Sequence, residues 1–239
     1  MEKNFCSCVW ILILLLFNAF ALSGIAQGQS VKSTAKDVID RLIEANHVKS
    51  EQVTVAMKLY DGKGKQREAT RRLRAYYSNE KAKGESKALF VFEAPNSLQG
   101  TKILTLQSDA ETGQWVYLSS LKKVTRITSG NESENILDSD LSYEDLQGES
   151  HHQYEYKFLE GEQTTKIANE SCNESAYAIL ASSREKKSKL YGQRILFISQ
   201  SKPVLCRIDF YGQGTGAKRR VKSIVNSGYV QDANYWRPQ

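Results

Sequence analysis

Residues 86–127, SKALFVFEAPNSLQGTKILTLQSDAETGQWVYLSSLKKVTRI, decide the fold class. The stretch consists of runs rich in β-branched, aromatic and other apolar residues, interrupted by Pro95, Gly100 and the polar residues 109–113. Such runs between turn residues are typical of short strands joined by tight connections. They predict strands over 86–93, 102–107, 114–118 and 123–127.

The residues before this stretch alternate with a period of two. Val53, Val55, Met57 and Leu59 are separated by more polar residues, and Asp61-Gly62-Lys63-Gly64 follows as a hairpin signal. The return strand is expected over 66–77, which is rich in arginine. A first set of strands therefore extends from residue 53 to residue 127.

The second half of the chain repeats this pattern. Strands are expected over 154–159, 176–181, 194–198, 204–211 and 219–224, with turns at 199–203 and at Gly212, Gly214 and Gly216. A brief helix is expected over 139–146. About eleven strands without alternating helices predict antiparallel pairing and a mainly β fold with some α structure.

One amphipathic helix is expected over 34–46. Its apolar residues recur at helical spacing, and Thr34 with Asp37 resembles a capping box. These apolar residues are Ala35, Val38, Ile39, Leu42 and Ile43.

The amino terminus has the pattern of an export signal. Lys3 precedes the apolar run 9–22, and Ser23-Gly24-Ile25-Ala26 offers small residues for cleavage after Ala26. The run is shorter than the ~20 residues of a spanning helix. We therefore expect a signal peptide over 1–26 and one domain over 27–239; an uncleaved amino-terminal anchor is the alternative.

Removing residues 1–26 leaves two of the four cysteines, Cys172 and Cys206. An even number of cysteines in an oxidising compartment suggests a disulfide. Two unlinked thiols on neighbouring strands are the alternative.

The formal net charge of +6 does not point to nucleic acid. The basic groups are scattered among acids, and export removes most nucleic-acid partners. A basic exterior instead favours transient contact with an anionic membrane surface or an acidic protein partner.

No catalytic motif and no metal-binding motif is found, and no cofactor is expected. His151 and His152 are adjacent, so on a strand they would point to opposite faces and would not chelate one metal together. The acidic residues 138–145 lack the spacing of a calcium loop. A site assembled from distant Ser, Asp or His residues remains open, but no pattern indicates an enzyme.

The central block also resembles the outer-membrane lipoprotein-sorting family, the LolA-like periplasmic lipoprotein carriers. The match is closest over about residues 90–146, and a looser match continues to Tyr235-Trp236-x-Pro238. The residues that carry it are Phe92-x-x-Pro95, Gly100-Thr101-Lys-Ile-Leu104-Thr, Trp115-Val-Tyr117-Leu118, Arg126-Ile127 and Ser139-Asp-Leu-Ser-Tyr143-Glu144-Asp145-Leu146.

This resemblance implies a strongly curved antiparallel sheet, a half-open barrel covered by helices. Leu141 stands where the family usually has Phe, and Ser119 where it commonly has Pro. Relatives usually continue beyond the Trp-x-Pro position with two more strands. We therefore expect either a truncated sequence or a member that lacks these strands and leaves a sheet edge open.

The resemblance also implies an apolar cavity for acyl chains, lined by one face of alternating strands. The candidate lining residues are Val55, Met57, Leu89, Val91, Leu104, Trp115 and Tyr117; dry core packing is the alternative for each. The helix at 34–46 and the segment 139–146 are the candidate lid. Its gating candidates are Arg67, Asp140, Tyr143, Glu144 and Asp145, with Arg67 expected to pair with one of the three acids. A structural salt bridge with no gating role is the alternative for this pair.

The leading hypothesis is a non-enzymatic periplasmic carrier that moves a lipid or acylated lipoprotein toward the outer membrane. An inner-membrane transporter and an outer-membrane receptor would be its partners. The alternatives are an accessory subunit of an envelope exporter, whose pocket is filled by side chains, and a hydrolase.

Overall fold

The computed structural model describes residues 33–80, 85–108, 111–128, 130–147, 153–159, 165–166, 172–184, 190–212, 219–232 and 235–238. The expected signal peptide, His151, His152, Gly214 and Gly216 lie outside these residues. Thr34–Gln239 form one compact unit.

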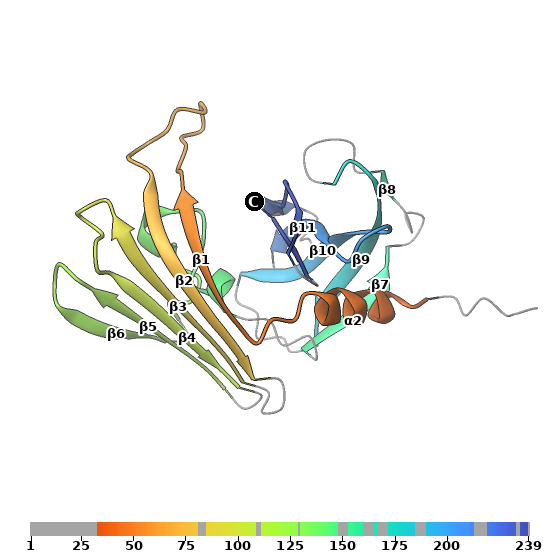
Figure 1. Ribbon diagram of the computed structural model, residues 1–239, viewed down its shortest axis with the longest axis horizontal. Helices are drawn as coiled ribbons and strands as arrows, with labels where there is room; N and C mark the ends of the chain where they lie inside the picture. The colour runs from red at the N-terminus through yellow and green to blue at the C-terminus, as the bar shows by residue number, and fades with distance from the viewer. Residues whose placement is uncertain are drawn as a thin grey trace, which may run out of the picture. The chain divides into compact units, whose positions relative to one another are not determined.

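The first sheet contains six antiparallel strands in sequence order, as Figure 1 shows. Its strands are β1 Ser50–Met57, β2 Arg71–Glu80, β3 Glu85–Ala94, β4 Lys102–Gln107, β5 Thr112–Leu118 and β6 Lys123–Ile127. The turn between β3 and β4 follows Pro95 and ends at Gly100, whose φ of 80° favours glycine.

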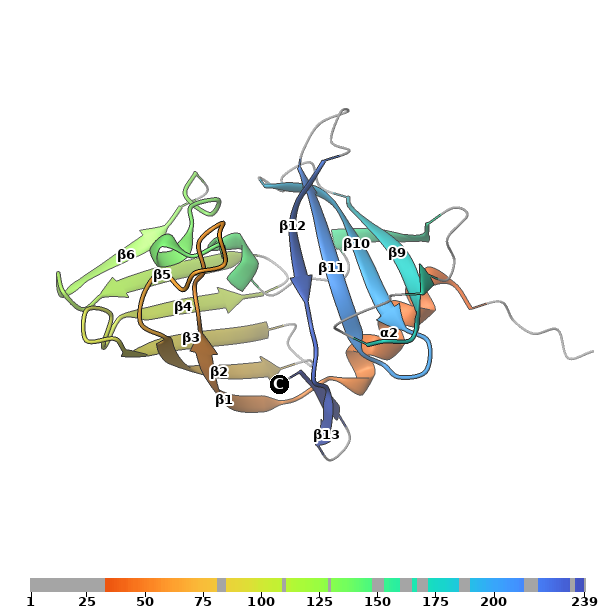
Figure 2. The same ribbon diagram turned by 90° about the horizontal axis from the view of Figure 1, so that it is seen from above.

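The second sheet has the order β12-β11-β10-β9-β7, and β8 also pairs with β9. Its strands are β7 Tyr154–Phe158, β8 Thr165–Lys166, β9 Ser175–Ser183, β10 Tyr191–Ser199, β11 Leu205–Gly212 and β12 Arg220–Val225. A separate hairpin follows, formed by β13 Val230–Asp232 and β14 Tyr235–Arg237 (Figure 2).

Helix α2, Ala35–Ala45, has the capping box that the sequence predicts. The hydroxyl of Thr34 accepts from the Asp37 backbone at 3.2 Å, and the Asp37 carboxylate accepts from the Thr34 backbone at 2.7 Å. Val38 and Ile39 pack on Ile179 and Ile198, so α2 covers the second sheet. Burying each such side chain stabilises the fold by about 1.5–3 kcal/mol. None of the described helices is long and apolar enough to cross a membrane.

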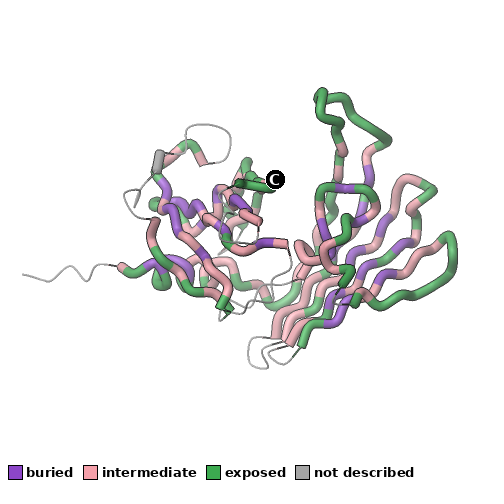
Figure 3. Tube along the Cα trace, turned by 180° about the vertical axis from the view of Figure 1, so that it is seen from behind, coloured by how far each residue is buried: buried purple, intermediate pink, exposed green. Residues whose placement is uncertain are grey.

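The core face of the first sheet is filled by a later part of the chain. Paired residues share a face, so Ala75, Phe90, Ile103 and Val116 form one buried row across β2–β5. Ile136 and Tyr143 pack on this face, which places the segment 136–146 against it. Figure 3 shows how buried and more exposed positions alternate along these strands.

Eleven of the expected strands are confirmed within a few residues, and 102–107 and 123–127 match β4 and β6. The strands β8, β13 and β14 were not expected because two or three residues are too few for a periodic pattern. The helix expected over 139–146 is reduced to a 3-10 turn at Glu144–Leu146, and a second 3-10 turn lies just before it at Ile136–Asp138.

The mainly β, antiparallel fold class is confirmed, but the half-open barrel covered by helices is wrong in two respects. No sheet of the described residues is closed or strongly curled, and α2 is the one α-helix found among them. The physical reason is that β6 is not followed in the ladder by β7, which pairs with β9 in the second sheet. The segment 136–146, which lies between these strands in the sequence, packs on the core face of the first sheet rather than extending its edge.

The disulfide between Cys172 and Cys206 is confirmed, with an S–S distance of 2.00 Å. Cys206 on β11 is buried in a cluster with Ala176, Ala178 and Phe197, and Cys172 packs against that cluster. The bond therefore closes a loop of the second sheet with a sequence separation of 34.

Replacing both cysteines by alanine should lower the free energy of unfolding by about 3–4 kcal/mol, because the unfolded chain gains the entropy of that loop. Urea denaturation of the wild type and of the Cys172→Ala/Cys206→Ala variant measures this loss. The wild type under reducing conditions should lose a similar amount. Equal midpoints for oxidised wild type and variant would contradict the expected role of the bond.

Candidate functional site

Two cavities lie beside the carboxyl-terminal half of α2. One has a volume of about 450 Å³ and the other about 390 Å³, and Leu42 lines both. Both volumes fall within the ~300–1,000 Å³ that is usual for small-molecule sites. We refer to them as the Trp236 cavity and the Ser199 cavity.

The Trp236 cavity has a mainly apolar lining with a few polar groups. Its residues come from α2 and the two residues after it, from β2, from the start of β11 and from the chain around the carboxyl-terminal hairpin. They are Leu42, Ile43, Asn46, His47, Asn79, Val204, Leu205, Asn226, Tyr229, Trp236 and Pro238. Such a lining offers apolar contact and a small number of hydrogen-bonding groups that can orient a ligand.

Asn46 holds three parts of this cavity together. Its amide nitrogen donates to the Leu42 carbonyl at 2.8 Å and to the Pro203 carbonyl at 2.7 Å. Its side-chain oxygen accepts from the Trp236 backbone at 3.2 Å. The end of α2 is therefore fixed to the turn before β11 and to β14.

Tyr229 contributes a partly buried hydroxyl to the same cavity. This hydroxyl and the Asn226 amide both donate to the Leu205 carbonyl. Burial raises the pKa of Tyr229 to about 12, although hydrogen bonds with Asn226 and Leu205 act in the opposite direction.

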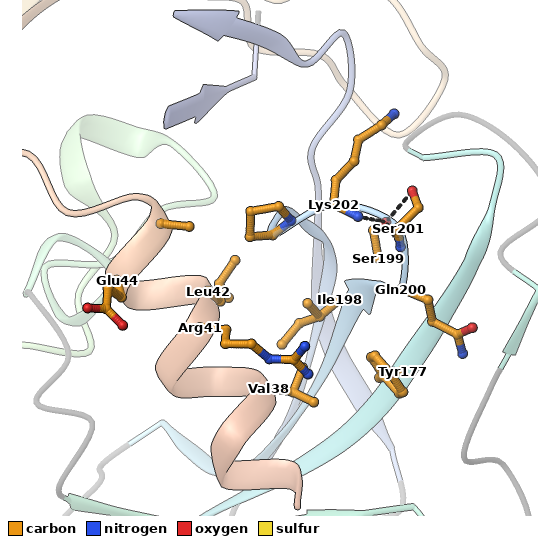
Figure 4. A pocket seen from close by; sticks show the side chains of 12 residues that line it. Val38, Arg41, Leu42, Glu44, Tyr177, Ile198, Ser199, Gln200, Ser201 and Lys202 are labelled. Atoms are coloured by element: carbon orange, nitrogen blue, oxygen red, sulfur yellow. Dashed lines mark hydrogen bonds between the residues drawn. The ribbon is translucent and has the colours of Figure 1, made fainter. Parts of the chain in front are cut away.

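The Ser199 cavity lies between α2 and the turn after β10, as Figure 4 shows. Val38, Leu42 and Ile198 supply apolar surface. The Ser199 hydroxyl accepts from the backbones of Ser201, at 3.2 Å, and Lys202, at 3.1 Å, which fixes the turn. The other lining residues are Arg41, Glu44, Ala45, Tyr177, Gln200 and Pro203.

The seven residues predicted to line a cavity lie on both faces of the first sheet. Val55 pairs with Leu73 and Met57 packs against the core cluster, which places these two on the core face. The other five lie on the opposite face. Leu89, Leu104 and Trp115 are paired in one row. Val91 and Tyr117 are both paired with Lys102, which lies two residues before Leu104 and therefore on the same face. None of the seven lines the two cavities beside α2, although Trp115 lines a smaller one of about 240 Å³.

Sequence reasoning missed the residues of the Trp236 cavity as a set. Leu42 and Ile43 belonged to the apolar stripe of the expected helix, and Trp236 belonged to the family pattern. The available signal was that the apolar stripe of the helix continues past Ile39 to Leu42 and Ile43. Their partners around residues 204 and 229 are too distant in sequence to be recognised from spacing.

The gating candidates lie in or near the segment 136–147. Arg67 donates to the Asp138 backbone carbonyl at 3.3 Å, rather than to one of the three expected carboxylates. Tyr143 is buried in the core of the first sheet, and Asp140 is exposed. Glu144 accepts from the Leu190 backbone at 3.3 Å. A gating role for these residues remains a prediction.

Asp145 connects this segment to the second sheet. Its carboxylate forms a salt bridge with Lys222, and the two side chains are only 4% and 14% exposed. It also accepts from the Tyr191 hydroxyl at 3.2 Å and from the Ser142 backbone at 2.7 Å. This carboxylate thus has partners on β10, on β12 and within its own segment.

Gln114 fixes the other side of the segment. Its buried amide donates to the Tyr143 carbonyl at 2.8 Å and to the Thr105 hydroxyl at 3.1 Å. The segment is therefore bonded to β4 and β5 of the first sheet and to β10 and β12 of the second.

Among the described residues there is no group of three or more His, Cys, Asp and Glu side chains that could hold a metal ion.

Asp145→Asn should lower the free energy of unfolding by about 3–5 kcal/mol, because Lys222 would keep a buried charge without its partner. Asp145→Asn/Lys222→Met should recover part of this loss, since neither charge remains. Urea denaturation measures both. Lys36→Gln, which breaks an exposed pair with Asp40, is the control and should cost at most about 0.5 kcal/mol. An Asp145→Asn variant as stable as that control would contradict the expectation.

The raised pKa of Tyr229 predicts a loss of stability at high pH. The folded state holds this proton more tightly than the unfolded state, so its contribution is complete below about pH 10 and falls as the pH rises toward about 12. The absorbance difference between wild type and Tyr229→Phe, titrated with base, should have a midpoint near pH 12. A midpoint near pH 10 would contradict burial of this hydroxyl.

The comparisons with known proteins agree with this architecture. A family model described only as an uncharacterized protein matches residues 84–239. No curated protein matches the chain. Two solved structures share the fold, each at 22% sequence identity.

One is a domain assigned as an outer-membrane lipoprotein-sorting protein from Vibrio parahaemolyticus, with a TM-score of 0.73 over 84% of this chain and 81% of that chain. The other is a DUF1329 family protein from Desulfovibrio piger, with a TM-score of 0.71 over 86% of this chain and 83% of that chain. The chain therefore belongs to the family of uncharacterized proteins that matches residues 84–239, and its fold is that of the outer-membrane lipoprotein-sorting-like proteins.

Proposed function

We propose that this protein is a non-enzymatic periplasmic carrier that binds the acyl chain of a lipid or lipoprotein and moves it toward the outer membrane. Residues 1–26 would act as a cleaved signal peptide and residues 27–239 as a single carrier domain. The similarity in fold to a lipoprotein-sorting domain supports this class of function.

The observation that carries the proposal is the apolar lining of the Trp236 cavity. An acyl chain of about 16 carbons is held in a membrane by roughly 10 kcal/mol, since each methylene that leaves water contributes about 0.8 kcal/mol. A soluble carrier has to offer comparable apolar contact. Leu42, Ile43, Leu205 and Trp236 supply such contact around a volume of about 450 Å³.

The position of α2 supports a route for the ligand. The helix packs on the second sheet with Ala35, Val38 and Ile39 buried, whereas Leu42 and Ile43 contact the same cluster but are only half-buried and also line the Trp236 cavity. The carboxyl-terminal end of α2 is bonded to its surroundings through the Asn46 side chain. Release of these two hydrogen bonds would let this end move without unpacking the amino-terminal half.

A second function is favoured by the filled core face of the first sheet. Ile136 and Tyr143 occupy the core face of the first sheet, where the family resemblance implies an open apolar cavity. A protein whose interior is filled in this way could serve an envelope exporter or assembly as an accessory subunit. Such a protein would have a stable protein partner, and its function would not depend on the Trp236 cavity.

Protein purified gently after export should contain stoichiometric lipid by native mass spectrometry, and stripped protein should bind a fluorescent fatty acid. Ile43→Trp should weaken this binding at least about tenfold, because the indole fills apolar volume that the chain would occupy. Lys36→Trp is the matched control, since it adds an indole on an exposed position of the same helix and should bind like the wild type.

Empty protein that takes up no fatty acid would overturn the carrier proposal. If a protein partner were then retained by both indole variants, the accessory role would replace it. Equal binding by Ile43→Trp and the wild type would exclude the Trp236 cavity as the acyl site.

A further inference from the structure

The face of the first sheet opposite its core carries apolar side chains that belong to none of the hydrophobic clusters of the described residues. Leu104 and Trp115 are paired on this face, and Tyr117 is paired with Val124. No described segment packs over them in the views of Figures 1 and 2. This face is therefore an uncovered sheet surface.

The turn between β5 and β6 extends this surface. Leu121 is 66% exposed and Val124 is 61% exposed, the highest values among the large apolar side chains that the structure describes. Hydrogen bonds from the backbones of Leu121 and Lys122 to the carbonyls of Leu118 and Ser119 define the turn. Lys122 adopts a φ of 49°, a left-handed conformation that favours glycine. Lysine thus occupies the tip of this turn although the left-handed backbone conformation is unfavourable for it.

The charge around this turn has one sign. Residues 118–128 contain Lys122, Lys123 and Arg126 and no Asp or Glu. Lys102 lies beside Tyr117 on the same face. The Arg126 guanidinium lies 5.6 Å from the centre of the Trp115 ring, so a cation stands next to the aromatic surface.

This combination matches the chemistry of an anionic bilayer surface. Tryptophan and tyrosine rings favour the headgroup level of a membrane, and exposed apolar side chains gain by entering it. Lysine and arginine are attracted by anionic headgroups, whereas lysine is depleted at the centres of protein–protein interfaces. An exposed leucine flanked by lysines therefore fits a lipid surface better than a protein partner.

We propose that the outer face of β4–β6, together with the turn 119–122, docks on the surface of an anionic phospholipid bilayer. Leu121 and Val124 enter the headgroup region, while Lys122 at the turn and Lys102 and Arg126 on the outer face contact lipid phosphates. This surface and the Trp236 cavity share no residue, so docking does not depend on acyl binding.

Flotation with phosphatidylcholine vesicles, prepared with and without phosphatidylglycerol, tests the proposal on protein purified after export. The wild type should bind the vesicles that contain phosphatidylglycerol, and added salt should weaken this binding. Lys102→Gln/Lys122→Gln should lower the partition coefficient about 25-fold, since each basic group contributes about fivefold. Leu121→Ser should lower it about tenfold or more.

Two matched controls separate this surface from general effects. Lys36→Gln/Lys157→Gln makes the same change in net charge at exposed sites on α2 and β7. Val221→Ser removes a side chain on β12 that is 55% exposed. Both controls should bind vesicles like the wild type, and all variants should keep the circular dichroism of the folded protein.

Equal partition onto both vesicle types, or equal loss in the test and control variants, would overturn the proposal. So would a wild type that binds no vesicles and sediments as a dimer that Leu121→Ser dissociates, because the face would then contact a second copy of the chain.

Discussion

The buried contact of Asp145 with Lys222 and Tyr191 holds together parts that are far apart in the sequence. The segment 142–147 has its aromatic side chain, Tyr143, in the core of the first sheet and its carboxylate, Asp145, against the second. A charge that is 4% exposed requires such partners, because an unpaired buried carboxylate would be too costly. The segment therefore has one strongly preferred position.

That position decides where open volume remains. Because Ile136 and Tyr143 fill the core face of the first sheet, the larger cavities described here lie beside α2. Asn46, at the end of α2, connects distant parts of the chain as Asp145 does beside the first sheet. It joins the helix end, the turn before β11 and the terminal hairpin through three hydrogen bonds. In our account a ligand enters where these few bonds open, while the disulfide and the packed half of α2 keep the second sheet intact.

The local elements could be predicted from the sequence because their signals are local. Period-two alternation placed the strands, and Thr34 with Asp37 placed the start of α2. The disulfide could be expected because Cys172 and Cys206 are the two cysteines outside the expected signal peptide. The sequence could not show that Val55 and Met57 lie on the core face while Leu104 and Trp115 lie on the opposite face. Alternation indicates that a strand has two faces, but it does not indicate which face is covered by the rest of the chain. The partner of Asp145 lies 77 residues away on β12, and nothing in local spacing points to Lys222.

Photocrosslinking with a diazirine-bearing fatty acid can show whether an acyl chain occupies the Trp236 cavity. After irradiation and proteolysis, mass spectrometry identifies the peptides that carry the label. If the chain lies in this cavity, the label should be found on peptides that contain Leu42 and Ile43, Leu205, or Tyr229 and Trp236. Label confined to the strands that carry Leu89, Leu104 and Trp115, or no label above that of unfolded protein, would contradict it.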